Sequence, residues 1–182
     1  MRLALLACLL CLPLAAQRAK APEKPAPKAE EKAAKIDWDG EWKLKPSQSD
    51  NVPEAIAEHV KDQNFALKLY WKKKLEKACP SYEKLDIFAS DTFSVTMGKE
   101  VPLDAQTDGT ANEWRNREGE TFSVTLKKDG ATMVQVLKGD GYVMTYRYTM
   151  RPDGQSLALQ VTYEHPKLVN PFSYKLVYRK ED

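Results

Sequence analysis

The chain has 182 residues, of which 42% are hydrophobic and 30% are charged, as is typical of one soluble globular domain with short extensions. Its 28 Lys and Arg residues nearly balance 26 Asp and Glu residues. The net charge of +2 argues against a nucleic-acid-binding protein, which needs a basic excess to neutralise phosphates. Two His and three Cys residues are too few for most metal or redox centres, so we expect no cofactor.

Residues 1–16 have the pattern of a signal peptide. Arg2 supplies the positive start, a short apolar run follows, and Ala15 and Ala16 offer small side chains to a signal peptidase. The apolar run is too short to span a bilayer. We therefore expect an exported protein, periplasmic or secreted. The alternative is a lipoprotein-type signal, because Leu5-Leu6-Ala7 precedes Cys8.

Residues 17–36 are rich in Ala, Lys, Pro and Glu and contain no aromatic residue. Such a segment buries too little apolar surface to offset its chain entropy, which predicts a disordered linker. The folded domain is expected over residues 37–182. Cleavage of the signal peptide removes Cys8 and Cys11, so Cys79 has no partner for an intrachain disulfide. We interpret Cys79 as a packing residue at the end of a helix.

The C-terminal two-thirds of the chain has the pattern of an antiparallel meander. An acidic residue precedes Gly at intervals of 10 to 13 residues, and such pairs favour tight hairpin turns. Apolar residues alternate with polar ones between the turns, as in half-buried strands. The glycines are Gly109, Gly119, Gly130, Gly141 and Gly154, and the clearest apolar faces start at Phe93, Phe122, Tyr142, Leu157 and Phe172. About eight or nine strands are predicted here, and closing them into a barrel would remove exposed edges.

A first strand is predicted at residues 41–45, separated from the meander by a helical insert at about 52–79. Asn51 is a suitable N-cap, and Pro80 ends the helical pattern. Polar residues 62–64 interrupt the pattern, which favours two helices. In the second helix, Leu67, Trp71 and Leu75 fall on one face and are expected to cover one mouth of the barrel.

The segment Gly40-Glu41-Trp42-Lys43-Leu44 resembles the Gly-x-Trp opening of the lipocalin and fatty-acid-binding-protein superfamily. It is closer still to exported bacterial lipocalin-like domains, which also carry a late Pro-Asp-Gly hairpin such as residues 152–154. The resemblance implies a mainly β protein, an antiparallel up-and-down β-barrel of lipocalin-like type. The helical insert after the first strand is similar to the helical lid of fatty-acid-binding proteins.

The same resemblance implies how the barrel closes. The last strand would pair with the first, with Gly40 and Trp42 at the seam and a cationic side chain over the tryptophan. Arg179 and Lys180 are the candidates, and we assign Arg179. The last strand reads Leu176-Val177-Tyr178 where fatty-acid-binding proteins have Arg-x-Tyr, so their carboxylate site does not carry over.

We predict a non-enzymatic, monomeric binding protein that holds an apolar or amphipathic small molecule inside the barrel. Alternation places one set of side chains on the inner wall: Trp42, Phe93, Val95, Met97, Phe122, Val124, Leu126 and Met144. The same alternation would also fit a solidly packed barrel. The alternative function is therefore an envelope-associated interaction module. Six Lys and two acidic residues in 61–77 would then meet an anionic membrane surface or a protein.

Motifs for catalysis are absent from the sequence. It contains no Gly-x-Ser-x-Gly elbow and no Walker loop. His59 and His165 are interpreted as solvated or capping residues, so we assign neither catalytic nor metal-binding residues. An isomerase-like enzyme that reuses a barrel cavity is a third, less favoured class, because barrels host unrelated activities.

Overall fold

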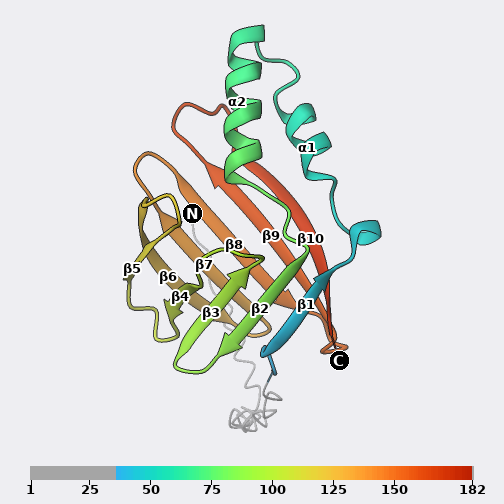
Figure 1. The fold of residues 1–182 in the computed structure, drawn as a ribbon, viewed down its shortest axis with the longest axis vertical. Helices are drawn as coiled ribbons and strands as arrows, with labels where there is room; N and C mark the ends of the chain where they lie inside the picture. The colour runs from blue at the N-terminus through green and yellow to red at the C-terminus, as the bar shows by residue number, and fades with distance from the viewer. Residues whose placement is uncertain (1–35, 182) are drawn as a thin grey trace, which may run out of the picture. The chain divides into compact units, whose positions relative to one another are not determined.

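Ten antiparallel strands roll into a nearly closed barrel in the computed structural model, which describes residues 36–181 (Figure 1). The strands are β1 (Gly40–Leu44), β2 (Lys84–Ala89), β3 (Thr92–Met97), β4 (Leu103–Gln106), β5 (Asn112–Arg115), β6 (Thr121–Asp129), β7 (Thr132–Lys138), β8 (Val143–Met150), β9 (Ser156–Glu164) and β10 (Phe172–Lys180). This confirms the predicted fold class. The predicted signal peptide and, apart from Ile36, the predicted linker lie outside the described residues.

The insert after β1 consists of a 3-10 turn (Pro46–Gln48) and two helices, α1 (Val52–His59) and α2 (Phe65–Ala78). Each helix begins at an asparagine whose side chain accepts a hydrogen bond from the first turn, Asn51 from Glu54 N and Asn64 from Leu67 N. Both helices stand at one end of the barrel, here called the helix end (Figure 1). The opposite end is called the far end.

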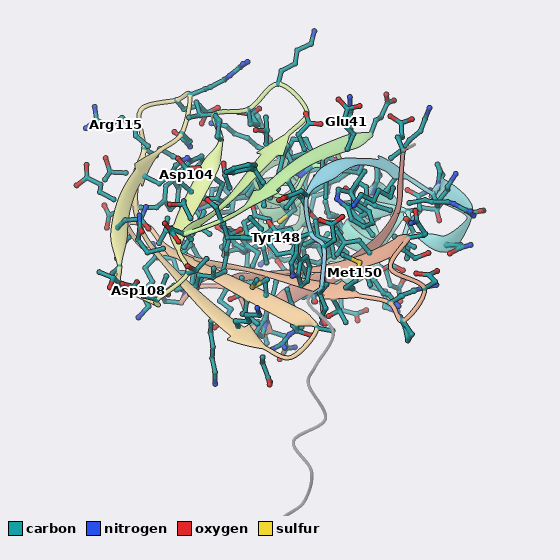
Figure 2. The ribbon with its side chains drawn as sticks, turned by 90° about the horizontal axis from the view of Figure 1, so that it is seen from below. Glu41, Asp104, Asp108, Arg115, Tyr148 and Met150 are labelled. Carbon is teal, nitrogen blue, oxygen red and sulfur yellow. The ribbon has the colours of Figure 1, made fainter. Side chains whose placement is uncertain are left out.

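Alternation along the strands separates the core from the surface, as the sequence predicts. Tyr148 and Met150 of β8 point into the interior, whereas Glu41 and Arg115 project outward (Figure 2). The five acidic–Gly pairs all lie in turns between strands, and each of these glycines has a positive φ. The hairpin turns therefore set the strand order by linking neighbours in sequence.

β1 closes the barrel because it pairs with β2 on one side and β10 on the other. Trp42 is fully buried at this seam, and Lys180 Nζ lies 5.7 Å from the centroid of its ring. Gly40 makes room for this contact, since a Cβ atom there would lie 2.9 Å from Lys180 Cε. The cation over the tryptophan is therefore Lys180 and not Arg179. Arg179 is the neighbouring residue of β10, so its side chain lies on the opposite face of the strand and is exposed to solvent.

A second seam lies between β4 and β5, the two ends of the strand order. Side-chain donors reach backbone carbonyls of the β4 segment there. Asn112 Nδ2 donates to Asp104 O at 3.1 Å, and Trp114 Nε1 donates to Pro102 O at 2.7 Å. The buried Gln135 of β7 adds a bond from its Nε2 to Leu103 O at 3.3 Å. These bonds connect β4 to β5 and β7 where the backbone ladder is interrupted.

We predict that Trp42→Ala lowers the free energy of unfolding by about 3 to 5 kcal/mol, because it empties a fully buried indole site at the closing seam. Lys180→Met should cost less, about 0.5 to 2 kcal/mol, since it removes only the cation over the ring and an ion pair with Asp37. Urea unfolding followed by tryptophan fluorescence and circular dichroism would measure both. Equal stability of wild type and Trp42→Ala would contradict the closure argument.

Candidate functional site

A cavity of about 710 Å³ lies inside the barrel at the helix end. Its floor is formed by side chains of β3, β4, β6, β7, β8 and β9. The floor residues are Val95, Met97, Leu103, Phe122, Leu137, Met144, Tyr146 and Tyr163. The mouth lies between the C-terminal end of α2, the β3–β4 turn and the β5–β6 turn. A volume of this size accommodates a drug-sized or lipid-sized molecule.

The cavity occupies only part of the interior, and the division follows position along each strand. On β3, Val95 and Met97 line the cavity, whereas Phe93, nearer the far end, is packed in the core. On β6 the lining residue is Phe122. Four of the eight side chains expected on the wall therefore line the cavity: Val95, Met97, Phe122 and Met144. Trp42, Phe93, Val124 and Leu126 belong to the packed core instead.

The far end is filled by aromatic side chains. Trp38, which precedes β1, is buried with its ring edge-on to Phe93 at 5.9 Å between centroids. Phe93 in turn contacts Tyr148 at 5.4 Å. Trp38 O also accepts a hydrogen bond from Trp42 Nε1 at 3.2 Å. These rings fill the interior at the far end, so Trp42 and Phe93 contact other side chains there and do not line the cavity.

The α2 helix stands at the helix end, and only part of its predicted face is packed against the barrel. Trp71 and Leu75 are buried, whereas Leu67 is 48% exposed. The expectation for Leu67 is wrong because the first turn of α2 extends beyond the barrel rim (Figure 1). The segment after α2 is tied to β10 by Tyr174 Oη, which donates to Pro80 O, and Tyr178 Oη, which donates to Tyr82 O, each at 3.0 Å.

A continuous chain of aromatic rings runs from β5 to α2, and the first four of its rings line the cavity. Successive ring centroids lie between 5.0 and 6.4 Å apart. The rings are, in order, Trp114, Phe122, Tyr142, Tyr163, His165 and Trp71. Gly139 leaves space for one of them, because a Cβ there would lie 2.7 Å from the Phe122 ring. An aromatic wall of this kind offers a large apolar contact surface with few rotatable bonds.

Sequence reasoning did not assign Tyr82, Trp114 and Tyr163 to the cavity. Tyr163 lies on the alternating apolar face that starts at Leu157, and this alternation is a usable signal. Trp114 lies on the four-residue strand β5, which is too short to show alternation. Tyr82 lies in the linker before β2, where no periodic pattern applies.

Charged side chains gather at the mouth of the cavity. Lys77 Nζ lies 2.7 Å from Glu118 Oε2, so α2 is bridged to the β5–β6 turn. Glu120 Oε2 accepts from Asn116 Nδ2 at 2.9 Å and from Tyr142 Oη at 3.2 Å. Exposed ion pairs contribute little stability, so the bridge between Lys77 and Glu118 is weak enough to open for an entering molecule.

Burial keeps the titratable groups around the cavity in their neutral forms. It raises the pKa of the Cys79 thiol from 9.0 to about 12, and that of Tyr163 from 10.0 to about 12. Burial and then Glu100 raise the pKa of Tyr82 to about 12. Burial, Lys74 and Lys167 lower the pKa of His165, so its ring is uncharged at neutral pH. The buried thiol at the end of α2 packs as a small apolar group.

The histidines and the acidic side chains of the described residues are separate from one another. Within residues 36–181, His, Cys, Asp and Glu side chains form no group of three that could hold a metal ion. The ring of His59 contacts Phe172 at 5.3 Å between centroids, and His165 Nδ1 accepts from Lys167 N at 3.0 Å. No helix in this part of the chain has the length and apolarity needed to cross a membrane. The feature of this region that could bind a small molecule is the cavity.

Several proteins of known structure have a similar architecture. No family model matches the chain, and no curated protein matches it in sequence. Among solved structures it is similar to a REP1-NXSQ fatty acid transporter, with a TM-score of 0.52 and 15% identity over 79% of this chain and 96% of that one. The chain has the fold of the fatty-acid-binding proteins.

Two further structures share this fold. Human cRBP IV has a TM-score of 0.50 and 16% identity, covering 80% of this chain and 98% of that one. The zebrafish ileal bile acid-binding protein complexed with cholic acid has a TM-score of 0.50 and 11% identity, with 79% and 98% covered. At these identities the likeness is one of fold. The helical pair after the first strand and the pairing of the last strand with the first are consistent with this fold.

We predict that alkaline pH destabilises the protein. Cys79, Tyr82 and Tyr163 keep their protons up to about pH 12 in the folded state, whereas the unfolded chain releases them from pH 9.0 and 10.0. The free energy of unfolding should therefore be fully present below pH 9.0 and fall as pH rises toward about 12. Urea unfolding at stepwise higher pH would measure the decline. Cys79→Val should make it shallower, and rapid alkylation of Cys79 in the folded protein would contradict the argument.

Proposed function

We propose that this protein is a non-enzymatic binding protein that holds one apolar or amphipathic small molecule in the cavity at the helix end. The observation that carries the proposal is a 710 Å³ cavity with an apolar and aromatic floor beneath a polar mouth. The proteins that share the fold include one named as a fatty acid transporter and one complexed with cholic acid, which supports the same class of ligand.

The energetics of the cavity favour moderate affinity. A ligand that buries roughly 300 Å² of apolar surface gains about 7 kcal/mol from leaving water. Lost translational and rotational freedom subtracts part of this gain. Reordering of the bridge between Lys77 and Glu118 adds a small further cost. The net gain is then less than about 7 kcal/mol, so we infer dissociation constants of about 10 μM or weaker for an apolar molecule of this size.

We predict that N-phenyl-1-naphthylamine, an uncharged probe that fluoresces in apolar surroundings, binds one-to-one with micromolar affinity. Phe122→Asp should abolish binding, because it places a carboxylate on the cavity floor. The matched control is Phe88→Asp, the same change on an outward-facing side chain of β2 that is 61% exposed. Fluorescence titration and calorimetry would measure both.

A second variant separates loss of the site from loss of the fold. Leu137→Trp puts an indole into the cavity without adding charge, so probe affinity should fall by about tenfold or more while urea unfolding stays cooperative. Full probe binding by both cavity variants would contradict this location of the site.

The outer face of α2 favours a second candidate function, docking to an anionic membrane. Phe65, Leu69 and Tyr70 are 84%, 61% and 53% exposed, and exposed lysines such as Lys72 and Lys73 lie beside them. A helix with exposed apolar and basic side chains suits the surface of an anionic bilayer. If the probe fails to bind and the protein sediments with phosphatidylglycerol vesicles at low salt, this function replaces the first. Leu69→Glu should then abolish sedimentation.

We also propose that the protein is exported, on the strength of the signal-peptide pattern in residues 1–16. We predict that mass spectrometry of the protein recovered from the natural host's envelope or medium finds an N-terminus near Gln17. Retention of residues 1–16, or a lipid on Cys8, would contradict cleavage after Ala16.

A further inference from the structure

The charges that line the cavity are confined to its mouth. Lys77, Arg117, Glu118 and Glu120 are exposed, and Lys74 and Glu100 are half-buried. Three basic and three acidic side chains therefore balance, and no Lys or Arg of the described residues lies on the cavity floor.

The cations at the mouth already have partners. Lys77 pairs with Glu118 at 2.7 Å, and Arg117 Nε lies 4.0 Å from Glu100 Oε2. Lys74 Nζ lies over the Trp71 ring, 5.5 Å from its centroid. An anionic group drawn into the cavity would leave water without gaining a free buried cation, which is unfavourable.

The floor carries the hydroxyl groups of two tyrosines instead, Tyr146 and Tyr163, and that of Tyr163 is the fully buried one. Tyr163 lines the cavity and is 1% exposed, and its hydroxyl is buried with no hydrogen-bond partner in residues 36–181. A buried hydroxyl without a partner is costly, and a hydrogen bond from a bound molecule removes that cost. The hydroxyl of Tyr142, the neighbouring ring, donates to Glu120 and is thereby engaged at the mouth.

We propose that the cavity selects an uncharged amphiphile whose hydroxyl or carbonyl group hydrogen bonds the Tyr163 hydroxyl, in preference to the corresponding carboxylate. This inference rests on the proposed binding function and specifies its ligand class. The Tyr163 hydroxyl keeps its proton at physiological pH. It can therefore donate a hydrogen bond to a carbonyl oxygen, and it can donate to or accept from an alcohol. The aromatic chain beside it supplies the apolar contact for the rest of the ligand.

Three probes of one ring system test the proposal: naphthalene, 2-naphthol and 2-naphthoate. Their affinities for the full folded domain are measured by displacement of bound N-phenyl-1-naphthylamine at neutral pH, where the naphthol is un-ionised and the naphthoate is an anion. We expect 2-naphthol to bind about fivefold more tightly than naphthalene, from one added hydrogen bond. We expect 2-naphthoate to bind about tenfold or more weakly than 2-naphthol.

Two conservative variants isolate the hydroxyl. Tyr163→Phe should abolish the advantage of 2-naphthol over naphthalene. Tyr148→Phe is the matched control, because its hydroxyl is also buried without a partner but the side chain does not line the cavity. It should leave the affinities for all three probes as in the wild type.

Several results would overturn the inference. They are equal binding of 2-naphthoate and 2-naphthol, equal binding of 2-naphthol and naphthalene, or a uniform loss of all three affinities in Tyr163→Phe. Each of these leaves the proposed binding function intact as long as N-phenyl-1-naphthylamine binds. Failure of that probe and of all three naphthalenes would overturn the binding function together with the inference.

Discussion

The short strand β1 is the constraint on which the rest of the barrel depends, because it must pair with both β2 and β10. β1 has only five residues, and the burial of Trp42 adds apolar stabilisation to its backbone pairing at the seam. Gly40 contributes by lacking a side chain, which lets Lys180 cross the ring. The helical insert is fixed through the same seam, since Tyr174 and Tyr178 of β10 bond the carbonyls of the segment after α2.

The cavity exists because the two ends of the barrel are filled differently. At the far end Trp38 packs its ring against Phe93, and Phe93 contacts Tyr148, so the interior there is close-packed. At the helix end α2 rises away from the barrel, its last turns border the mouth, and Trp71 and Leu75 pack against the core. One face of alternating side chains therefore serves as core over part of its length and as cavity wall over the remainder.

The second seam, between β4 and β5, lies next to the mouth of the cavity. Side-chain hydrogen bonds donated by Asn112, Trp114 and Gln135 hold β4 near β5 and β7. They take the place of the regular backbone hydrogen bonds that pair neighbouring antiparallel strands. Trp114 takes part in both features, because its indole nitrogen bonds Pro102 O and its ring lines the cavity. Opening of this seam would therefore change the cavity wall. The polar groups that give the site its chemistry come from turns and strand ends around it.

The sequence by itself determined which side of each strand is buried and where the chain turns. The period of two placed Phe93, Val95 and Met97 inward together, and the acidic–Gly pairs marked the turns, because both signals are local. The interruption before Asn64 likewise separated the two helices. Only the tertiary structure decided that Met97 lines a cavity while Phe93 is packed, or that Lys180 rather than Arg179 covers Trp42. Depth along a barrel and the register of closure depend on elements distant in sequence, Trp38 and β10 among them, and no local period encodes their approach.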